Sequence, residues 1–286
     1  MRFSVLGPVG VVVDRHPVSA PRGHDRTLLA ILLAADGDTV STGHLIEALW
    51  PGAPPISARK SLQSHLSRLR RYLREHADDG IDRVQNTPGG YRIKVIDAEV
   101  DARQFVGLVA RARHAQTPHE SLALLEAAEA CWRGPAFGDL AHHPSVIDAA
   151  HQLERQRRAA TTERAAVLQD LGRYDDLVEI LPAIIAEDPY NERAYAQLMN
   201  ALVATGRRAE ALTTFDQLRT WLSEELGIDP NPELRRLHQE ILRQDTLPSG
   251  TGLPTMRATV ARRTTPLLGR DRDLDELSAE LPGPHF

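Results

Sequence analysis

The sequence predicts an α+β domain over residues 1–96, followed by an all-α domain over residues 97–245. Apolar residues follow the two-residue period of β-strands at the start of the chain and again near residue 90, and three helical patterns lie between. Beyond residue 100 the strand patterns stop and helices rich in Ala, Leu, Glu and Arg succeed one another. A similar stretch recurs there at an offset of 34 residues, the period of tetratricopeptide helix pairs. These observations favour a winged helix joined to a helical repeat domain.

The composition is that of a soluble globular protein, because 42% of the 286 residues are hydrophobic and 26% are charged. A single cysteine, Cys131, excludes an intramolecular disulfide and favours a reducing cytoplasm. No window approaches the roughly 18 uninterrupted apolar residues of a membrane-spanning helix, and Gly and Pro interrupt the apolar start. We therefore expect a cytoplasmic protein without a membrane partner.

Charge divides the chain into unlike parts. Residues 1–96 hold 13 Lys and Arg against 9 Asp and Glu, a net charge of +4, whereas residues 97–245 hold 16 against 25, a net charge of −9. The positive charge is concentrated in residues 56–74, which contain six Lys or Arg and no acid. A basic element on a small domain beside an acidic remainder suggests a nucleic-acid reader with a protein-binding domain, although a basic helix can also be a merely solvated face.

The start of the N-terminal domain predicts short antiparallel strands. Phe3, Val5, Val9, Val11 and Val13 fall on alternate positions, and the glycines and the proline between them are turn residues.

Two short helices are predicted next. Residues 28–33 form a mostly buried helix that stops at Asp36 and Gly37, where Gly can take the left-handed conformation. A second helix begins at the hydroxyl of Ser41 and runs to Trp50, where Pro51 breaks it.

A long basic helix opens near Ser57 and has two chemically distinct faces. Its leucines step by 4, 3 and 4 residues and so form one apolar stripe, at Leu62, Leu66, Leu69 and Leu73. The opposite face and its flanks carry Arg59, Lys60, Gln63, Ser64, Ser67, Arg68, Arg71 and Arg74. Arg and Lys neutralise phosphates, Arg and Gln can bond base edges, and Ser can donate to phosphate oxygens. Residues 83–95 then predict a hairpin around an Asn/Pro/Gly turn, which would be the wing.

Four linked motifs resemble the DNA-binding domain of Streptomyces antibiotic regulatory proteins. They lie in order at residues 22–33, at 37–41 with 49–52, at 64–70 and at 89–92. The resemblance implies an OmpR-type winged helix-turn-helix whose recognition helix binds double-stranded DNA. It further implies that Arg26 touches phosphate and that the wing contributes Thr87 and Arg92. Where the family commonly has a basic residue near the wing tip, this chain has Asn86, Thr87 and Pro88.

The helical part is similar to the bacterial transcriptional activation domain that follows the winged helix in this family. Residues 171–177 align with 205–211 at an offset of 34, and residues 188–192 align with 229–233 at an offset of 41. The second copy is therefore expected to hold 7 extra residues, about two helical turns. The resemblance implies an activator that binds direct repeats near the promoter −35 region, assembles as a homodimer on DNA, and recruits RNA polymerase with its sigma factor. Antibiotic biosynthesis genes would be its targets, and the bacterial nucleoid its location.

Residues 246–286 are expected to form a flexible linker followed by either the start of a truncated ATPase domain, such as large family members carry, or the remnant tail of a short member. No P-loop sequence follows before Phe286, so nucleotide binding by this segment is not expected.

Other functions find little support in the sequence. The twelve histidines match no zinc-site spacing and there is no G-x-S-x-G sequence, so we expect neither a cofactor nor an enzyme. Two alternatives remain. One is a tetratricopeptide-type scaffold without specific DNA binding, and the other is the sensory front end of an ATPase switch, against which the missing P-loop argues.

Overall fold

The computed structural model describes residues 1–14, 16–77 and 81–243. Residues Met1–Leu242 form one compact unit. The predicted linker and ATPase start, residues 246–286, lie outside the described residues.

The N-terminal sheet has three antiparallel strands in the order β1-β2-β3. They are β1 (Arg2–Ser4), β2 (Gly10–Val13) and β3 (His16–Pro17), with Phe3 opposite Val11. Phe3, Val5, Val9 and Val11 are buried and Val13 is half-buried, but Ser4 and Leu6 are buried as well. The predicted short antiparallel strands are confirmed, whereas burial does not alternate along them.

Three helices follow, as predicted: α1 (His24–Ala34), α2 (Thr42–Leu49) and α3 (Ala58–Glu75). The Ser41 hydroxyl caps α2 by accepting a hydrogen bond from the His44 backbone N–H at 3.1 Å. This bond satisfies one of the free N–H groups at the helix start.

The wing is the hairpin β5 (Val84–Thr87) and β6 (Gly90–Ile93), and β4 (Val40–Ser41) completes a second sheet in the order β4-β6-β5. Position 90 requires glycine, because a Cβ there would lie 2.0 Å from the Val40 carbonyl oxygen. The hairpin prediction is therefore confirmed, and β4 ties the wing to the start of α2.

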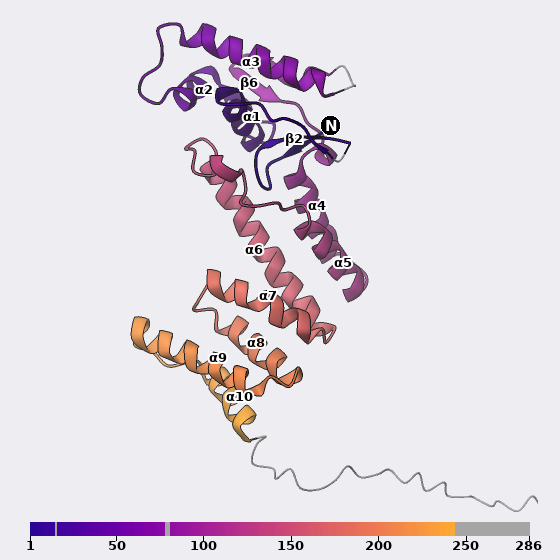
Figure 1. Ribbon diagram of the computed structural model, residues 1–286, viewed down its shortest axis with the longest axis vertical. Coiled ribbons are helices and arrows are strands. Elements are labelled where there is room, and N and C mark those ends of the chain that lie inside the picture. The colour runs from indigo at the N-terminus through magenta and orange to yellow at the C-terminus, as the bar shows by residue number, and fades with distance from the viewer. Residues whose placement is uncertain (15, 78–80, 244–286) are drawn as a thin grey trace, which may run out of the picture. The chain divides into compact units, whose positions relative to one another are not determined.

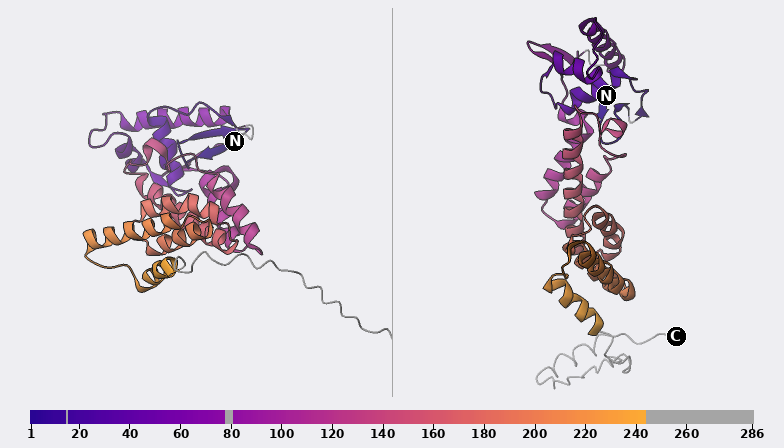
Figure 2. Two further views of the ribbon diagram at one scale, coloured as in Figure 1. Left: turned by 60° about the horizontal axis from the view of Figure 1, so that its bottom comes forward. Right: turned by 90° about the vertical axis from the view of Figure 1, so that its left-hand side faces the viewer.

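The rest of the described chain is helical, and consecutive helices from α4 to α9 lie side by side (Figures 1 and 2). Its α-helices are α4 (Asp101–Arg113), α5 (Pro118–Glu129), α6 (Ile147–Asp170), α7 (Tyr174–Glu187), α8 (Glu192–Ala204), α9 (Arg208–Trp221) and α10 (Pro232–Arg243). Two 3₁₀ turns, Asp97–Glu99 and Gly138–Leu140, precede α4 and α6, and a π-helical turn, Leu222–Leu226, extends α9.

The 34-residue repeat is confirmed in hydrogen-bonding detail. Gly172 and Gly206 end their helices at φ of 67° and 76°, which glycine adopts readily. The next backbone N–H groups bond back equivalently, from Arg173 to Leu168 at 2.9 Å and from Arg207 to Leu202 at 2.7 Å. Each of these arginines also pairs with an acid three residues later.

The second offset differs by one residue from the sequence alignment. Asn191 caps α8 through the Ala194 N–H, and Asn231 caps α10 through the Leu234 N–H, 40 residues further on. The alignment of Asp-Pro pairs gave 41, because it matched sequence rather than cap positions. Most of the extra length is the π-helical turn after α9.

One hydrophobic core runs from the winged helix into α4–α6, and a second extends from α5 and α6 through α7–α10. Backbone bonds join the first core across residue 96: Phe137 N–H donates to the Val5 carbonyl at 2.6 Å, and Arg133 N–H donates to that of Leu6 at 2.8 Å. The half-buried Asp101 carboxylate accepts from the N–H groups of Val5 and Leu6 at 2.9 and 3.2 Å and pairs with Arg133 at 2.6 Å.

We predict that Asp101→Ala lowers the free energy of unfolding by about 3 kcal/mol, because it leaves two buried N–H donors and a paired arginine without an acceptor. Asp101→Asn keeps one acceptor oxygen and should cost less, about 1–2 kcal/mol. Urea unfolding measures both, with the exposed Asp170→Ala as control. Equal stability of the Ala variant and the control would contradict this role.

Candidate nucleic-acid interface

Helix α3 is positioned by its leucine stripe. Leu62, Leu66, Leu69 and Leu73 are at most 1% exposed and belong to the first core. They hold α3 against α1, α2 and β5 (Figure 1). Because an α-helix turns 100° per residue, burying this stripe directs the opposite side of α3 to solvent.

The solvent side of α3 carries all the residues that the sequence assigned to it. The following are exposed: Arg59, Lys60, Gln63, Ser64, Ser67, Arg68, Arg71 and Arg74. Within the part of the chain that the structure describes, Arg59, Lys60 and Arg74 make no ion pair, and Arg71 has only a long 3.8 Å contact with Glu75. Four cations on one helix are thus available to an external anion.

Arg68 differs from its neighbours because it is held by α1. Its Nε donates to Asp25 Oδ2 at 3.0 Å and its Nη2 to Asp25 Oδ1 at 3.3 Å. Asp25 also contacts His65 Nδ1 at 2.6 Å. This pairing raises the pKa of Arg68 and orients its side chain, which remains 47% exposed. The prediction that Arg68 lies off the leucine stripe is confirmed. The sequence did not predict its contact with α1, which a substitution of Arg68 would also break.

Arg70, which the sequence did not assign to the interface, joins α3 to the wing. Its Nε donates to the Val84 carbonyl at 2.8 Å, its Nη2 donates to Asn86 Oδ1 at 2.9 Å, and its guanidinium lies 5.8 Å from the Tyr91 ring centre. It therefore fixes the wing beside the exposed face of α3. Its place on the flank of the leucine stripe was the only sequence signal for this role.

In the wing, the two predicted contact residues differ. Arg92 is exposed, and its Nε and Nη2 donate to Gln85 Oε1 at 3.2 and 3.1 Å. The hydroxyl of Thr87, by contrast, is buried and has no hydrogen-bond partner among the residues that the structure describes. The predicted contact of Thr87 with DNA stays a prediction, and it would involve the partly exposed surface of this residue rather than its buried hydroxyl.

Arg26, the predicted phosphate contact at the start of α1, is ion-paired with Asp139 in the 3₁₀ turn before α6. Its side chain is 29% exposed. The structure thus brings Arg26 to the helical domain rather than leaving it free, and an external phosphate would have to compete with Asp139.

Among residues 1–14, 16–77 and 81–243, no group of three or more His, Cys, Asp or Glu side chains could hold a metal ion. In the same residues, no helix combines the length and apolarity needed to cross a membrane.

Comparison with known families matches both parts of the chain. The model of the bacterial transcriptional activator domain matches residues 100–242. The model of the C-terminal domain of transcriptional regulatory proteins matches residues 22–93, which include α1 to β6.

Individual relatives agree with these matches. The chain is 33% identical to the transcriptional regulatory protein EmbR of Mycobacterium tuberculosis, over 90% of this chain and 67% of that protein. It is 34% identical to the regulatory protein AfsR of Streptomyces griseus, over 86% of this chain but only 25% of that protein. A solved structure of M. tuberculosis EmbR in complex with a low-affinity phosphopeptide superposes with a TM-score of 0.72 at 33% identity, covering 85% of this chain and 65% of that one.

The chain spans about two thirds of the length of EmbR and a quarter of that of AfsR. The order of matched domains, the winged-helix geometry and these relatives lead to one assignment. The chain belongs to the Streptomyces antibiotic regulatory protein family of transcriptional regulators, with an OmpR-type winged helix followed by a bacterial transcriptional activator domain.

Proposed function

We propose that this regulator activates transcription by placing α3 in the major groove of promoter DNA and recruiting RNA polymerase. The observation that carries the proposal is the set of exposed cations on α3, of which Arg59, Lys60 and Arg74 make no ion pair among the described residues. Exposed cations without acidic partners are available to neutralise phosphates and release counterions from DNA.

The length of α3 divides the proposed contacts into two kinds. Lys60 and Arg74 are 14 residues apart, about 21 Å along the axis at 1.5 Å per residue, whereas a B-DNA major groove is about 12 Å wide. The ends of the exposed face therefore reach the two phosphate backbones, through Arg59, Lys60, Arg71 and Arg74. Gln63, Ser64 and Ser67 lie between them and face the base edges, where a glutamine amide can pair with adenine.

The remaining contacts are supplied by side chains that other residues orient. Arg68 contacts the DNA while its guanidinium is oriented by the hydrogen bond to Asp25. Arg92 contacts the DNA from the wing, which Arg70 holds beside α3. Arg26 contacts a DNA phosphate only after its ion pair with Asp139 has broken. Thr87, the last residue of β5, completes the proposed wing contacts through its partly exposed surface rather than through its buried hydroxyl.

On the same proposal, two protomers bind direct repeats near the −35 region as a homodimer assembled on DNA. The helical domain, with its net charge of −9 over residues 97–245, contacts RNA polymerase and its sigma factor. Such a protein acts in the cytoplasm, on the nucleoid, and antibiotic biosynthesis genes are its targets. Family membership supports these assignments, and a promoter titration with and without polymerase tests them.

The phosphate contacts are tested by the double variant Arg71→Ala/Arg74→Ala. We expect affinity for promoter DNA to fall about 10–100-fold and the slope of log K against log salt to become shallower by about 2, one unit per lost phosphate contact. Fluorescence anisotropy at several salt concentrations measures both. Arg235→Ala/Arg236→Ala, an equally exposed pair on α10, should change neither. An unaltered slope in the α3 variant would contradict the assignment.

The base-reading role of the middle of α3 is tested by Gln63→Ala. We expect binding to a promoter fragment selected by the unmodified protein to weaken by about 1–3 kcal/mol, while binding to random DNA and the salt slope stay the same. Equal weakening on both DNAs would mean that Gln63 contributes only to non-specific contact.

The competition for Arg26 is tested by Asp139→Ala. Because the substitution frees a cation at the start of α1, DNA affinity should rise a few-fold and the salt slope should steepen by up to about 1. The variant Arg26→Ala/Asp139→Ala should lose this gain. A gain that persists without Arg26 would show that Asp139 acts in another way.

A further inference from the structure

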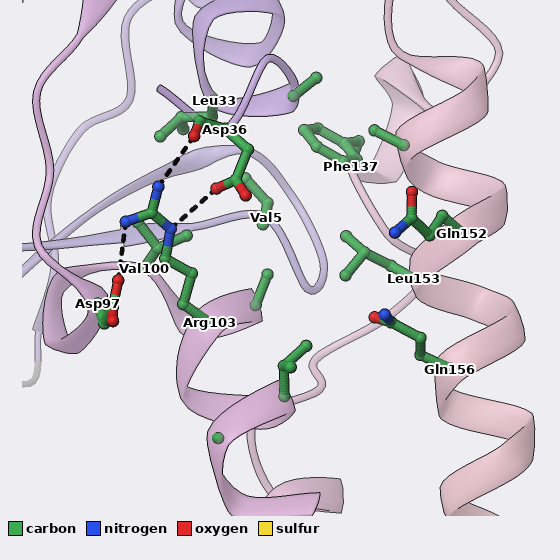
Figure 3. Close-up of a pocket in the computed structure, with 15 residues that line it drawn as sticks. Val5, Leu33, Asp36, Asp97, Val100, Arg103, Phe137, Gln152, Leu153 and Gln156 are labelled. Carbon is green, nitrogen blue, oxygen red and sulfur yellow. Dashed lines mark hydrogen bonds and ion pairs between the residues drawn. The ribbon is translucent and has the colours of Figure 1, made fainter. Parts of the chain in front are cut away.

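A cavity of about 620 Å³ lies at the junction of the winged helix with α4 and α6 (Figure 3). One side is formed by Val5 and by Leu33 and Asp36 at the end of α1, and the opposite side by α6. The volume falls in the range of small-molecule sites, about 300–1,000 Å³. All of its walls belong to the compact unit that ends at Leu242.

The cavity exists partly because α4 carries a glycine at its wall. Gly107 lies in the middle of α4, and a Cβ added there would meet no atom within 4 Å. Its φ is not positive, so the backbone does not require glycine. A mid-helix glycine costs roughly 0.5–1 kcal/mol relative to alanine. The missing side chain therefore leaves open space next to Val106, which is 42% exposed at the mouth.

The charged groups of the cavity are already paired with one another. Arg103 Nε donates to Asp36 Oδ1 at 2.8 Å, and its Nη1 donates to Asp97 Oδ1 at 2.9 Å. Its Nη2 also donates to the Asp36 carbonyl at 3.1 Å. One guanidinium beside two carboxylates leaves no spare positive charge, which disfavours an anionic ligand.

The uncharged polar groups of the cavity, by contrast, have no partner in the protein. Gln152 and Gln156 direct their amides from α6 toward the space in front of Arg103 (Figure 3). Within the described residues, neither amide takes part in a hydrogen bond. Each offers both a donor and an acceptor, one helical turn apart on α6.

We propose that this cavity binds one neutral, largely apolar small molecule that carries a carbonyl or hydroxyl oxygen. Its apolar body lies against Ala102, Val106, Ala149 and Leu153, the apolar lining residues that keep exposed surface, and its oxygen bonds the amides of Gln152 and Gln156. The proposal goes beyond DNA binding, because it adds a ligand site between the DNA-binding part and the activator part. It is tested without DNA and does not depend on the proposed role of α3.

The test is a titration of the full chain with Nile red, a neutral dye that has an apolar ring system and a ring carbonyl and that fluoresces in apolar surroundings. We expect saturable binding of one dye per chain. Gly107→Leu fills the cavity from α4 and should weaken binding at least tenfold, and Ala149→Met, which fills it from α6, should do the same. Gln156→Ala removes one amide and should weaken binding about fivefold.

The matched control is Gly43→Leu, which makes the same change at another helical glycine with open space around it, outside the cavity. Dye binding should stay as in the unmodified chain. Circular dichroism establishes that each variant is folded, and either cavity-filling variant suffices if the other unfolds. The anionic dye 1-anilinonaphthalene-8-sulfonate should bind at least tenfold more weakly than Nile red at this site.

Equal Nile red affinity in the unmodified chain and in a folded cavity-filling variant would overturn the proposal, because the dye would then bind elsewhere. Absence of saturable Nile red binding would overturn it as well. Tighter binding of the anionic dye, lost in Gly107→Leu, would overturn the assignment of a neutral ligand.

Discussion

Burial of the α3 leucine stripe against α1 and α2 is the interaction on which the rest of the DNA-binding part depends. Each fully buried leucine contributes about 1.5–3 kcal/mol relative to an exposed one, so the four together outweigh the cost of crowding cations on the other face. The stripe fixes the rotation of α3 about its axis. Two further contacts then hold α3 in place: Arg68 pairs with Asp25 of α1, and Arg70 bonds the Val84 carbonyl of the wing.

The winged helix is not an isolated module in this chain. Its core continues into α4 and α6, and the Asp101 carboxylate, the Phe137 backbone N–H and the Arg26–Asp139 pair all join residues more than 90 positions apart. A change at this junction therefore affects both parts. The junction also contains the largest of the cavities described, so that a molecule bound there would touch residues of α1, α4 and α6 together.

The sequence was most informative where function follows from periodicity. The leucine steps on α3 predict which of its residues are exposed, and the 34-residue repeat predicts equivalent helix ends at Gly172 and Gly206. It could not reveal contacts between distant segments. The pairing of Arg68 with Asp25 and of Arg26 with Asp139, and the burial of the Thr87 hydroxyl, arise from how helices and strands pack. The cavity at Gly107 depends on three segments of the chain, so local pattern carries no sign of it.

Tethered cleavage from α3 tests the central claim most directly. In a Cys131→Ser chain, which has no other cysteine, Ser67→Cys places a single reactive thiol in the middle of the exposed face of α3. With an iron chelate attached at that thiol, our account predicts cleavage of promoter DNA confined to a few adjacent nucleotides in each bound repeat. The same chelate at Glu240→Cys on α10 should give no localised cleavage there. Cleavage that is spread evenly along the DNA, or absent although the protein is bound, would contradict the placement of α3 in the groove.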